Sequence, residues 1–238
     1  MNILALDSSG AVASVAISCD GRIRGEYSIN HKLTHSETLM PMVDELIRRT
    51  EYETDKTSVI AVAAGPGSFT GLRIGAAAAK GMAFALGCDI VPVPTLEGLC
   101  YQLTEYPGLI CPLMDARRAQ VYSGVYRFES GKLKTVFAGE ALALEEQLGR
   151  LKELDSDVMF LGDGVDVHME AIKEHMGDHC LMAPEHRRYQ NAACVAKRAE
   201  EMLAEGVAAV KAEDFAPEYL RRSQAERERD ERIAAEKA

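Results

Sequence analysis

The chain has 238 residues, of which 47% are hydrophobic, so it can bury one large core or two small ones and is not a disordered chain. Its net charge of -10 argues against a broad basic surface for nucleic acid, because phosphate binding relies on clustered Lys and Arg. Any contact with RNA is therefore expected to be limited or made through a partner protein.

The six cysteines are scattered without a C-x-x-C pair, which is typical of reduced, buried thiols. Residues 1–7 already read as a strand, and no basic segment precedes an apolar one. No apolar run approaches the roughly 18 residues of a membrane span. A cytoplasmic protein without membrane contact is expected.

The first half of the chain reads as three strands, a helix, a strand, a second helix and a further strand. Thr34 and Ser36 are candidate N-caps of the first helix, and Pro41 is expected near its first turn, because deeper in the helix it would remove a backbone hydrogen bond. Alternating or continuous apolar runs predict the strands, and 3-4 spacing predicts the helices. The strands are expected at 2–6, 11–18, 22–28, 58–64 and 89–93.

The second half repeats this pattern of elements, although not the residues themselves. Strands are expected at 109–114, 119–128, 133–138 and 158–161, and helices at about 144–154, 165–176 and 190–205. Asp7 and Asp115 then end equivalent first strands. The duplication predicts an α/β fold of two ribonuclease-H-like lobes, with mixed sheets flanked by helices and a cleft at the strand ends.

The repeat also suggests the domain boundaries. We expect a first lobe at 1–105, which the helix at about 190–206 could join, and a second lobe at 106–223. The last segment, 224–238, is predicted to be a flexible tail, since nine of its final fourteen residues are charged.

A glycine-rich turn at 65–75 stands between an apolar strand and an alanine-rich helix. Its G-x-G-x-x-x-G spacing differs from the dinucleotide fingerprint, and no Gly-Lys-Ser/Thr follows. Gly71, Gly75, Ala79 and Ala83 recur every four residues, so they form a side-chain-free stripe that a second backbone can approach. The stripe either packs within the protein's own lobe or forms a subunit contact.

Six segments together resemble the TsaB (YeaZ) family of the ASKHA superfamily, which also contains sugar kinases, heat-shock ATPases and actin. The glycine-turn segment is the most specific of them, and together they span residues 7 to 221. They are Asp7-Ser8-Ser9, His35-Ser36-Glu37 with Leu39 and Pro41, the turn 65–73, Asp115-Ala116-Arg117-Arg118, Gly162-Asp163-Gly164 and Pro217-Glu218-Tyr219-Leu220-Arg221.

The resemblance implies a non-catalytic subunit for making N6-threonylcarbamoyladenosine beside the anticodon of tRNAs that read codons starting with A. It implies a heterodimer with the catalytic paralogue TsaD, a further partner in the ATPase TsaE, a homodimer when the chain is alone, and tRNA contact mainly through the complex. It favours a subunit contact for the stripe. The implied interface residues are Ser36, Leu39, Met42, Val43, Leu46, Ile47, Phe69, Thr70, Gly71, Arg73, Ile74, Gly75, Ala78, Ala79 and Met82.

An ASKHA kinase or ATPase needs glycines around its phosphate loops, so that backbone amides can approach the phosphates. Here Ser8 and Ser9 follow Asp7, and two bulky cations, beginning with Arg117, follow Asp115 and Ala116. The sequence therefore predicts a degenerate nucleotide loop and no cofactor bound by the chain alone. ADP or ATP at the joint with TsaD and TsaE is an open expectation, to which Arg73 could contribute. The alternative function is a small kinase or ATPase that uses Asp7 and Asp115.

Metal binding and hydrolase chemistry are less favoured. His31 and His35 have the spacing of two ligands on one helical face, but no third ligand is evident, so His35 is expected to orient the helix. His175 and His179 share the spacing on an acidic surface helix. No Gly-x-Ser-x-Gly elbow is present that would mark a nucleophilic serine.

Overall fold

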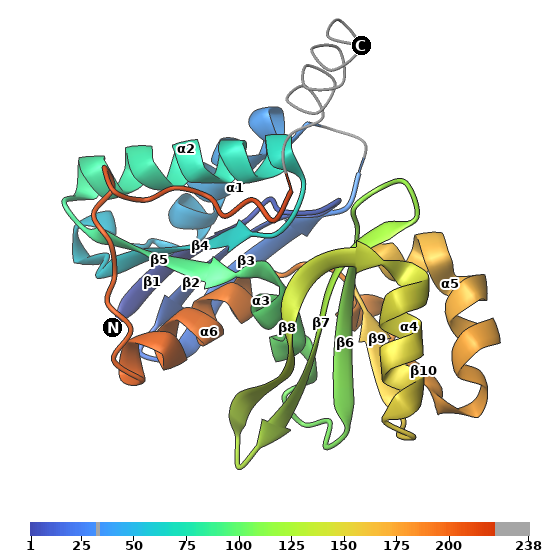
Figure 1. The fold of residues 1–238 in the computed structure, drawn as a ribbon. Coiled ribbons are helices and arrows are strands. Elements are labelled where there is room, and N and C mark those ends of the chain that lie inside the picture. The colour runs from blue at the N-terminus through green and yellow to red at the C-terminus, as the bar shows by residue number, and fades with distance from the viewer. Residues whose placement is uncertain (32–33, 222–238) are drawn as a thin grey trace, which may run out of the picture.

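The computed structural model describes residues 1–31 and 34–221, and its first lobe is built on a five-stranded mixed sheet (Figure 1). The strand order is β3-β2-β1-β4-β5, with β1 antiparallel to β2 and parallel to β4. The central strands are apolar and buried, as in sheets covered on both faces. The strands are β1 (Asn2–Asp7), β2 (Ala13–Cys19), β3 (Arg22–Ile29), β4 (Val59–Gly65) and β5 (Asp89–Pro94).

Helices cover both faces of this sheet (Figure 1). On one face lie α1 (His35–Thr50) and α2 (Phe69–Leu86), and on the other lies α6 (Ala192–Ala204). The side-chain oxygen of Ser68 accepts a hydrogen bond from the Gly71 amide at 3.3 Å and caps the start of α2. Gly87 ends that helix in the left-handed conformation.

The second lobe repeats the same sheet, in the order β10-β9-β6-β7-β8. Apolar residues of α4 and α5 pack on one face of this sheet, and α3 packs on the other. Four single 3-10 turns complete the described structure, at Thr54–Lys56, Tyr101–Leu103, Gly177–His179 and Glu185–Arg187. The elements are α3 (Thr95–Cys100), β6 (Leu109–Asp115), β7 (Gln120–Glu129), β8 (Lys132–Ala143), α4 (Leu144–Glu153), β9 (Val158–Leu161), α5 (Asp163–Met176) and β10 (Cys180–Met182).

The two lobes therefore have the same topology, which confirms the predicted α/β fold class. β1 and β6 hold the same central place in their sheets, and they end at Asp7 and Asp115. Both carboxylates consequently lie at the edge where the lobes face each other.

After α6 the chain returns along the first lobe as an extended segment, which we call the strap (residues 207–221; Figure 1). Val210 and Ile90 exchange two backbone hydrogen bonds of 2.8 Å, and Phe215 is buried in the first core. The Lys80 ammonium donates to the carbonyl of Phe215 at 2.8 Å. The sequence analysis had assigned these residues to the second lobe. In the structure the strap packs on the first lobe, because Phe215 is buried in the core of that lobe.

Three details differ from the sequence analysis. Pro41 lies in the second turn of α1, not the first, and its outward position leaves the freed backbone carbonyl near solvent. The short elements α3 and β10 were not predicted. All six cysteines are free thiols, but only Cys100 and Cys111 are fully buried.

The predicted tail at 224–238 lies outside the described residues. Within the described part of the chain, no helix combines the length and the apolar character that crossing a membrane requires.

Candidate functional site

A cleft of about 870 Å³ opens between the two lobes at the ends of their central strands. The first lobe contributes the turn after β1 and the start of α2. The second lobe contributes the turn after β6 and the start of α5, and the end of the strap forms part of the wall. This placement agrees with the predicted position of a ligand cleft in sheets of this kind.

Asp7 lies beneath the floor of this cleft and is almost completely buried. Its Oδ1 accepts hydrogen bonds from the amide of Ser9 at 2.9 Å and from the Ser9 hydroxyl at 2.6 Å. Burial disfavours the charged form and raises the pKa of Asp7 to about 6. The carboxylate thus holds its own loop closed rather than facing the cleft.

On the opposite side, Asp115 accepts a hydrogen bond from the amide of Arg117 at 2.9 Å. Arg117, Arg118 and Ala119 all have left-handed backbone conformations, with φ of 62°, 55° and 56°. Such a run is unusual for residues with side chains, and strained backbone of this kind is concentrated at functional sites. The turn pushes its cationic side chains outward, and Arg117 lines the cleft.

A third carboxylate, Asp163 at the start of α5, was not assigned to the cleft by the sequence analysis. Its Oδ2 accepts a 3.3 Å hydrogen bond from the amide of Ala11, which links the two lobes. Burial raises the pKa of Asp163, and its other oxygen has no hydrogen-bond partner among the described residues. The duplication offered a signal for this position, because β9 holds the place in the second sheet that β4 holds in the first. The segments that follow both strands line the cleft.

The residues present do not fit a magnesium-bound phosphate, which the ASKHA fold would imply. The turn before α2 packs directly on the turn after β1: the amide of Ser68 donates to the carbonyl of Ser9 at 2.7 Å, and a Cβ at Gly67 would lie 2.3 Å from the same oxygen. The backbone groups that would hold a phosphate are thus bonded within the lobe. Among the described residues, no cluster of three His, Cys, Asp or Glu could hold a metal ion.

The three turn serines have structural partners. Ser8 donates its hydroxyl proton to the carbonyl of Gly71 at 2.9 Å, Ser9 bonds Asp7, and Ser68 caps α2. His35 bonds the carbonyl of Gly10 at 2.8 Å and so ties the start of α1 to the same turn. This geometry lacks the serine–histidine pair that a hydrolase requires.

His31, His175 and His179 also fail to converge on a common site. His31 is exposed and lies before the start of α1. His179 is on the surface of the second lobe, with its Nδ1 3.0 Å from the Oδ1 of Asp157. His175, four residues before His179, is also exposed. Among the described residues, these histidines are not part of a metal-ligand set.

The small-residue stripe of α2 faces the protein's own lobe. A Cβ at Gly71 would lie 2.0 Å from the carbonyl oxygen of Ser8, and one at Gly75 would lie 2.5 Å from the Ser8 hydroxyl. Ala79 and Ala83 are buried in the first core. The prediction that the stripe itself forms a subunit contact is therefore wrong, because it is the turn after β1 that approaches it.

The apolar face of α1 is likewise internal. Four of its six predicted interface residues, Leu39, Met42, Val43 and Leu46, are at most 6% exposed and pack in the first core, so their side chains cannot form a partner surface.

Two large apolar side chains remain exposed on α1 and α2, which contact each other. Phe84 of α2 is 85% exposed, and Met40 of α1 is 44% exposed; neither was predicted as an interface residue. Among the predicted interface residues, those still accessible are Ser36, Ile47, Phe69, Thr70, Arg73, Ile74, Ala78 and Met82.

The start of α2 is joined to the strap by an aromatic cluster. The rings of Phe69 and Tyr219 are 4.6 Å apart, and the guanidinium of Arg73 lies 4.0 Å above the Phe69 ring. Arg73 Nε also donates to the Tyr219 hydroxyl at 3.4 Å. Farther along the strap, Arg221 donates to the carbonyl of Ala116 at 2.6 Å and so reaches the second lobe.

Comparison with known proteins identifies the family. A profile of the family described as "TsaD: tRNA N6-adenosine threonylcarbamoyltransferase" matches residues 26–229. The chain is 35% identical over 229 residues to the tRNA threonylcarbamoyladenosine biosynthesis protein TsaB of Bacillus subtilis strain 168, covering 95% of this chain and 96% of that one. The chain belongs to the TsaB (YeaZ) family.

Two further relatives span nearly the whole length. TsaB of Escherichia coli K12 is 27% identical over 227 residues, covering 93% of this chain and 95% of that protein. The structure titled "YeaZ from Pseudomonas aeruginosa" superimposes with a TM-score of 0.74 at 25% identity, covering 92% of this chain and 99% of that one. The TsaB family resemblance seen in the sequence motifs is thereby confirmed over both lobes.

Proposed function

We propose that this TsaB-family chain is a non-catalytic subunit that binds and activates a TsaD-type transferase, which makes N6-threonylcarbamoyladenosine next to the anticodon of tRNA. The names of its relatives support a role in this tRNA modification. The degenerate loops at Asp7 and Asp115 support a role without catalysis, because the loop backbone is bonded internally and no metal cluster is found in the described part of the chain.

The observation that carries the proposal is the pair of exposed apolar side chains on α1 and α2. Phe84 of α2 is 85% exposed and Met40 of α1 is 44% exposed, whereas Ile74, Ala78 and Met82 of α2 pack partly against the first core. Large apolar side chains left exposed on two helices that contact each other are candidates for a protein interface, in which aromatic side chains are enriched. The accessible residues of these two helices are therefore the proposed contact with TsaD, and with a second copy of the chain when TsaD is absent.

The remaining partners follow from the same role. TsaE would join the assembled pair, ADP or ATP would lie at that joint rather than on this chain alone, and the tRNA would be held mainly by the complex. The net charge of -10 agrees with limited RNA contact by this subunit.

The test is reconstitution. Mixing the chain with TsaD, TsaE and substrate tRNA of its own organism should yield the modified nucleoside, measured by mass spectrometry of digested tRNA, and omitting the chain should abolish it. Phe84→Asp should reduce both modification and association with TsaD. Val207→Asp, at an apolar position 43% exposed after α6, is the matched control. Full activity without the chain, or equal activity of the two variants, would refute the proposal.

A further inference from the structure

A group of polar side chains lies where the two lobes meet. Among the residues that the structure describes, four buried side-chain atoms lack a hydrogen-bond partner: Asp163 Oδ1, His168 Nε2 and both amide atoms of Gln190. Gln190 is only 2% exposed, so its amide is shielded from bulk water. Because buried polar groups are nearly always hydrogen-bonded, these unpartnered atoms call for a physical explanation.

Gly10 shows that two of these residues are neighbours. A Cβ at Gly10 would lie 2.1 Å from Gln190 Nε2 and 2.8 Å from Asp163 Oδ2, so both side chains fill the space beside this glycine. Gly10 belongs to the first lobe and Asp163 to the second. Gln190 lies in the segment that returns to the first lobe, where the Ala192 amide donates to the Ser14 hydroxyl oxygen at 2.9 Å. We call Gly10, Asp163 and Gln190 the junction.

The first lobe brings a second carboxyl group to the junction. Asp7 ends β1 and accepts hydrogen bonds from Ser9, and the amide of Ala11 in the same turn donates to Asp163 Oδ2 at 3.3 Å. One short turn of the first lobe therefore carries Asp7 and is bonded to Asp163 of the opposite lobe.

Burial makes ionisation of both carboxyl groups unfavourable. It raises the pKa of Asp7 to about 6 and also raises the pKa of Asp163, by more than the hydrogen bonds from Ser9 and Ala11 lower them. The nearby Gln190 amide also lowers the pKa of Asp163, although it lies outside hydrogen-bond geometry. The charge of Asp163 raises the pKa of Asp7 further, so the two groups interact across the lobe boundary.

No described cation forms an ion pair with either carboxyl group. His168 lies 3.6 Å from Asp115, and Arg188 is bonded to Asp166 at 2.9 Å. Asp7 and Asp163 are bonded by neutral groups instead. The other ionisable groups around the junction and the cleft are His35 of α1, Arg73 of α2, Asp115 and Arg117 at the end of β6, Asp166 and His168 of α5, Arg188 and Tyr189 before α6, Cys194 of α6, and Glu218 and Arg221 of the strap.

We propose that the junction is a proton-controlled latch between the lobes. It is closed while Asp7 and Asp163 carry protons, and the protonated Asp163 then donates to the side-chain oxygen of Gln190. It opens when both groups ionise, because two negative charges without a cation must then be solvated at the lobe boundary. Opening breaks the hydrogen bond between Ala11 and Asp163 and admits water to the floor of the cleft. The latch is a property of the chain alone and does not depend on the proposed function.

Hydrogen exchange of the Ala11 amide in the full-length chain measures the latch. The protection factor, which corrects for the pH dependence of intrinsic exchange, should be about tenfold or more lower at about pH 8 than at about pH 5, since one pKa unit corresponds to a factor of ten. The amide of Ile90, bonded to Val210 within the first lobe, is the reference.

At about pH 8, Ala11 should be less protected than Ile90, because the latch opens while the sheet stays folded. Equal protection of the two amides would mean that only global unfolding exposes Ala11, and it would overturn the proposal.

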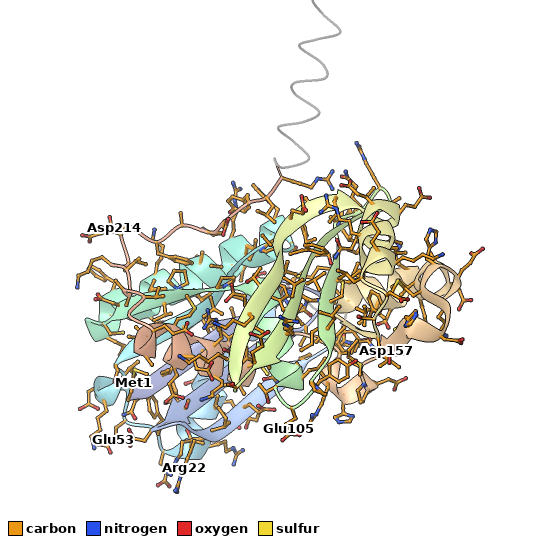
Figure 2. All side chains as sticks on the ribbon, turned by 60° about the horizontal axis from the view of Figure 1, so that its bottom comes forward. Met1, Arg22, Glu53, Glu105, Asp157 and Asp214 are labelled. Atoms are coloured by element: carbon orange, nitrogen blue, oxygen red, sulfur yellow. The ribbon has the colours of Figure 1, made fainter. Side chains whose placement is uncertain are left out.

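Replacing both carboxyl groups tests their role. In the double variant Asp7→Asn and Asp163→Asn, each side chain keeps an oxygen acceptor and cannot ionise, so the fall in Ala11 protection with pH should disappear. The matched control removes one exposed carboxylate from each lobe, with Asp157→Asn and Asp214→Asn, both labelled at the outer surface in Figure 2. The control should keep the wild-type fall. Equal pH dependence of the two double variants would contradict the latch.

Gly10 provides an independent test should the double variant fail to fold. In Gly10→Ala the added Cβ would lie 2.1 Å from Gln190 Nε2, so the Gln190 amide must move away. Ala11 protection at about pH 5 should then fall by about tenfold. Gly149→Ala, in α4 with nothing within 4 Å, should leave it unchanged. Equal Ala11 protection in these two variants would rule the latch out.

Discussion

At the scale of single residues, Asp7 should give the protein a specific pH dependence. Burial raises its pKa from an ordinary 3.8 to about 6, so between these values the folded state binds more protons than the unfolded state. The contribution of Asp7 to the unfolding free energy is therefore largest below about pH 4, and it is lost as the pH rises through 6. Asp7→Asn keeps an oxygen for Ser9 but removes the charge.

The unfolding free energy of the variant minus that of wild type should increase by about 2–3 kcal/mol as the pH rises from 4 to 7. This follows because each unit of pKa shift corresponds to about 1.4 kcal/mol. Urea unfolding at several pH values measures this difference directly. The charge of Asp163, whose own pKa is also raised by burial, contributes to the raised pKa of Asp7, so part of the difference reflects the interaction of the two carboxyl groups. Parallel stability curves would show that Asp7 is not the titrating group.

Two glycines of α2 provide a second test at this scale. Gly71→Ala places a Cβ about 2.0 Å from the carbonyl of Ser8, so α2 must move away from the turn after β1, at a cost of about 1–3 kcal/mol. Gly81→Ala, in the same helix with nothing within 4 Å, should instead stabilise the protein by up to about 1 kcal/mol. Thermal unfolding of the pair measures both signs, and equal shifts would contradict this packing.

The stripe also shows what spacing cannot reveal. The four-residue period correctly predicts that Gly71, Gly75 and Ala79 share one face of a helix. It does not specify which neighbour that face meets, and Ser8 lies 63 residues before Gly71 in the chain. Helical periodicity therefore predicted the surface but not its partner.

At the scale of elements, the end of the strap should be required and the residues after it should not. A chain ending at Ala216 loses four links between the strap and the lobes. They are the hydrogen bond from the Glu218 amide to the Ala64 carbonyl, the ring contact of Tyr219 with Phe69, the hydrogen bond from Arg73 to the Tyr219 hydroxyl, and the hydrogen bond from Arg221 to the Ala116 carbonyl. We expect a lower melting temperature and impaired tRNA modification with the partners. Thermal unfolding and reconstituted modification are the measurements.

A chain ending at Ser223 keeps these links and should match the full-length protein in both assays, because the removed segment is dominated by charged residues with little apolar surface to bury. Equal activity of the two truncations would show that Pro217–Arg221 has no such role.

Elements with a strong periodic signal were predicted to within a few residues. The strands β1 and β9 and the helices α4 and α5 begin and end close to their expected positions. Short elements were missed, since six residues of α3 and three of β10 give too little periodicity to detect. Pro41 was placed too early in α1, because proline is costly within a helix but can be accommodated where its outer face meets water.

At the scale of the whole molecule, the duplication made part of the site predictable. Equal element order in the two halves places Asp7 and Asp115 at equivalent strand ends, and the structure has them there. Tyr189 also lines the cleft, but nothing local in the sequence marks it. Arg221 belongs to a segment that the sequence motifs singled out, but its place in the cleft wall was not predicted, because it depends on how the strap returns along the first lobe.

The closed loops at the cleft lead to the last prediction: the purified chain alone should neither hydrolyse ATP appreciably nor modify tRNA. Turnover would need phosphate to approach the amides of Ser9 and Ser68, which already donate to Asp7 and to the Ser9 carbonyl. It would also need Asp7 to leave the bonds it makes with Ser9. Phosphate release from ATP, with and without TsaD, measures this. Hydrolysis by the chain alone that Asp7→Ala abolished would establish an enzyme. Activity unaffected by both Asp7→Ala and Asp115→Ala would point to a contaminant, since these are the carboxylates at the ends of the equivalent strands β1 and β6.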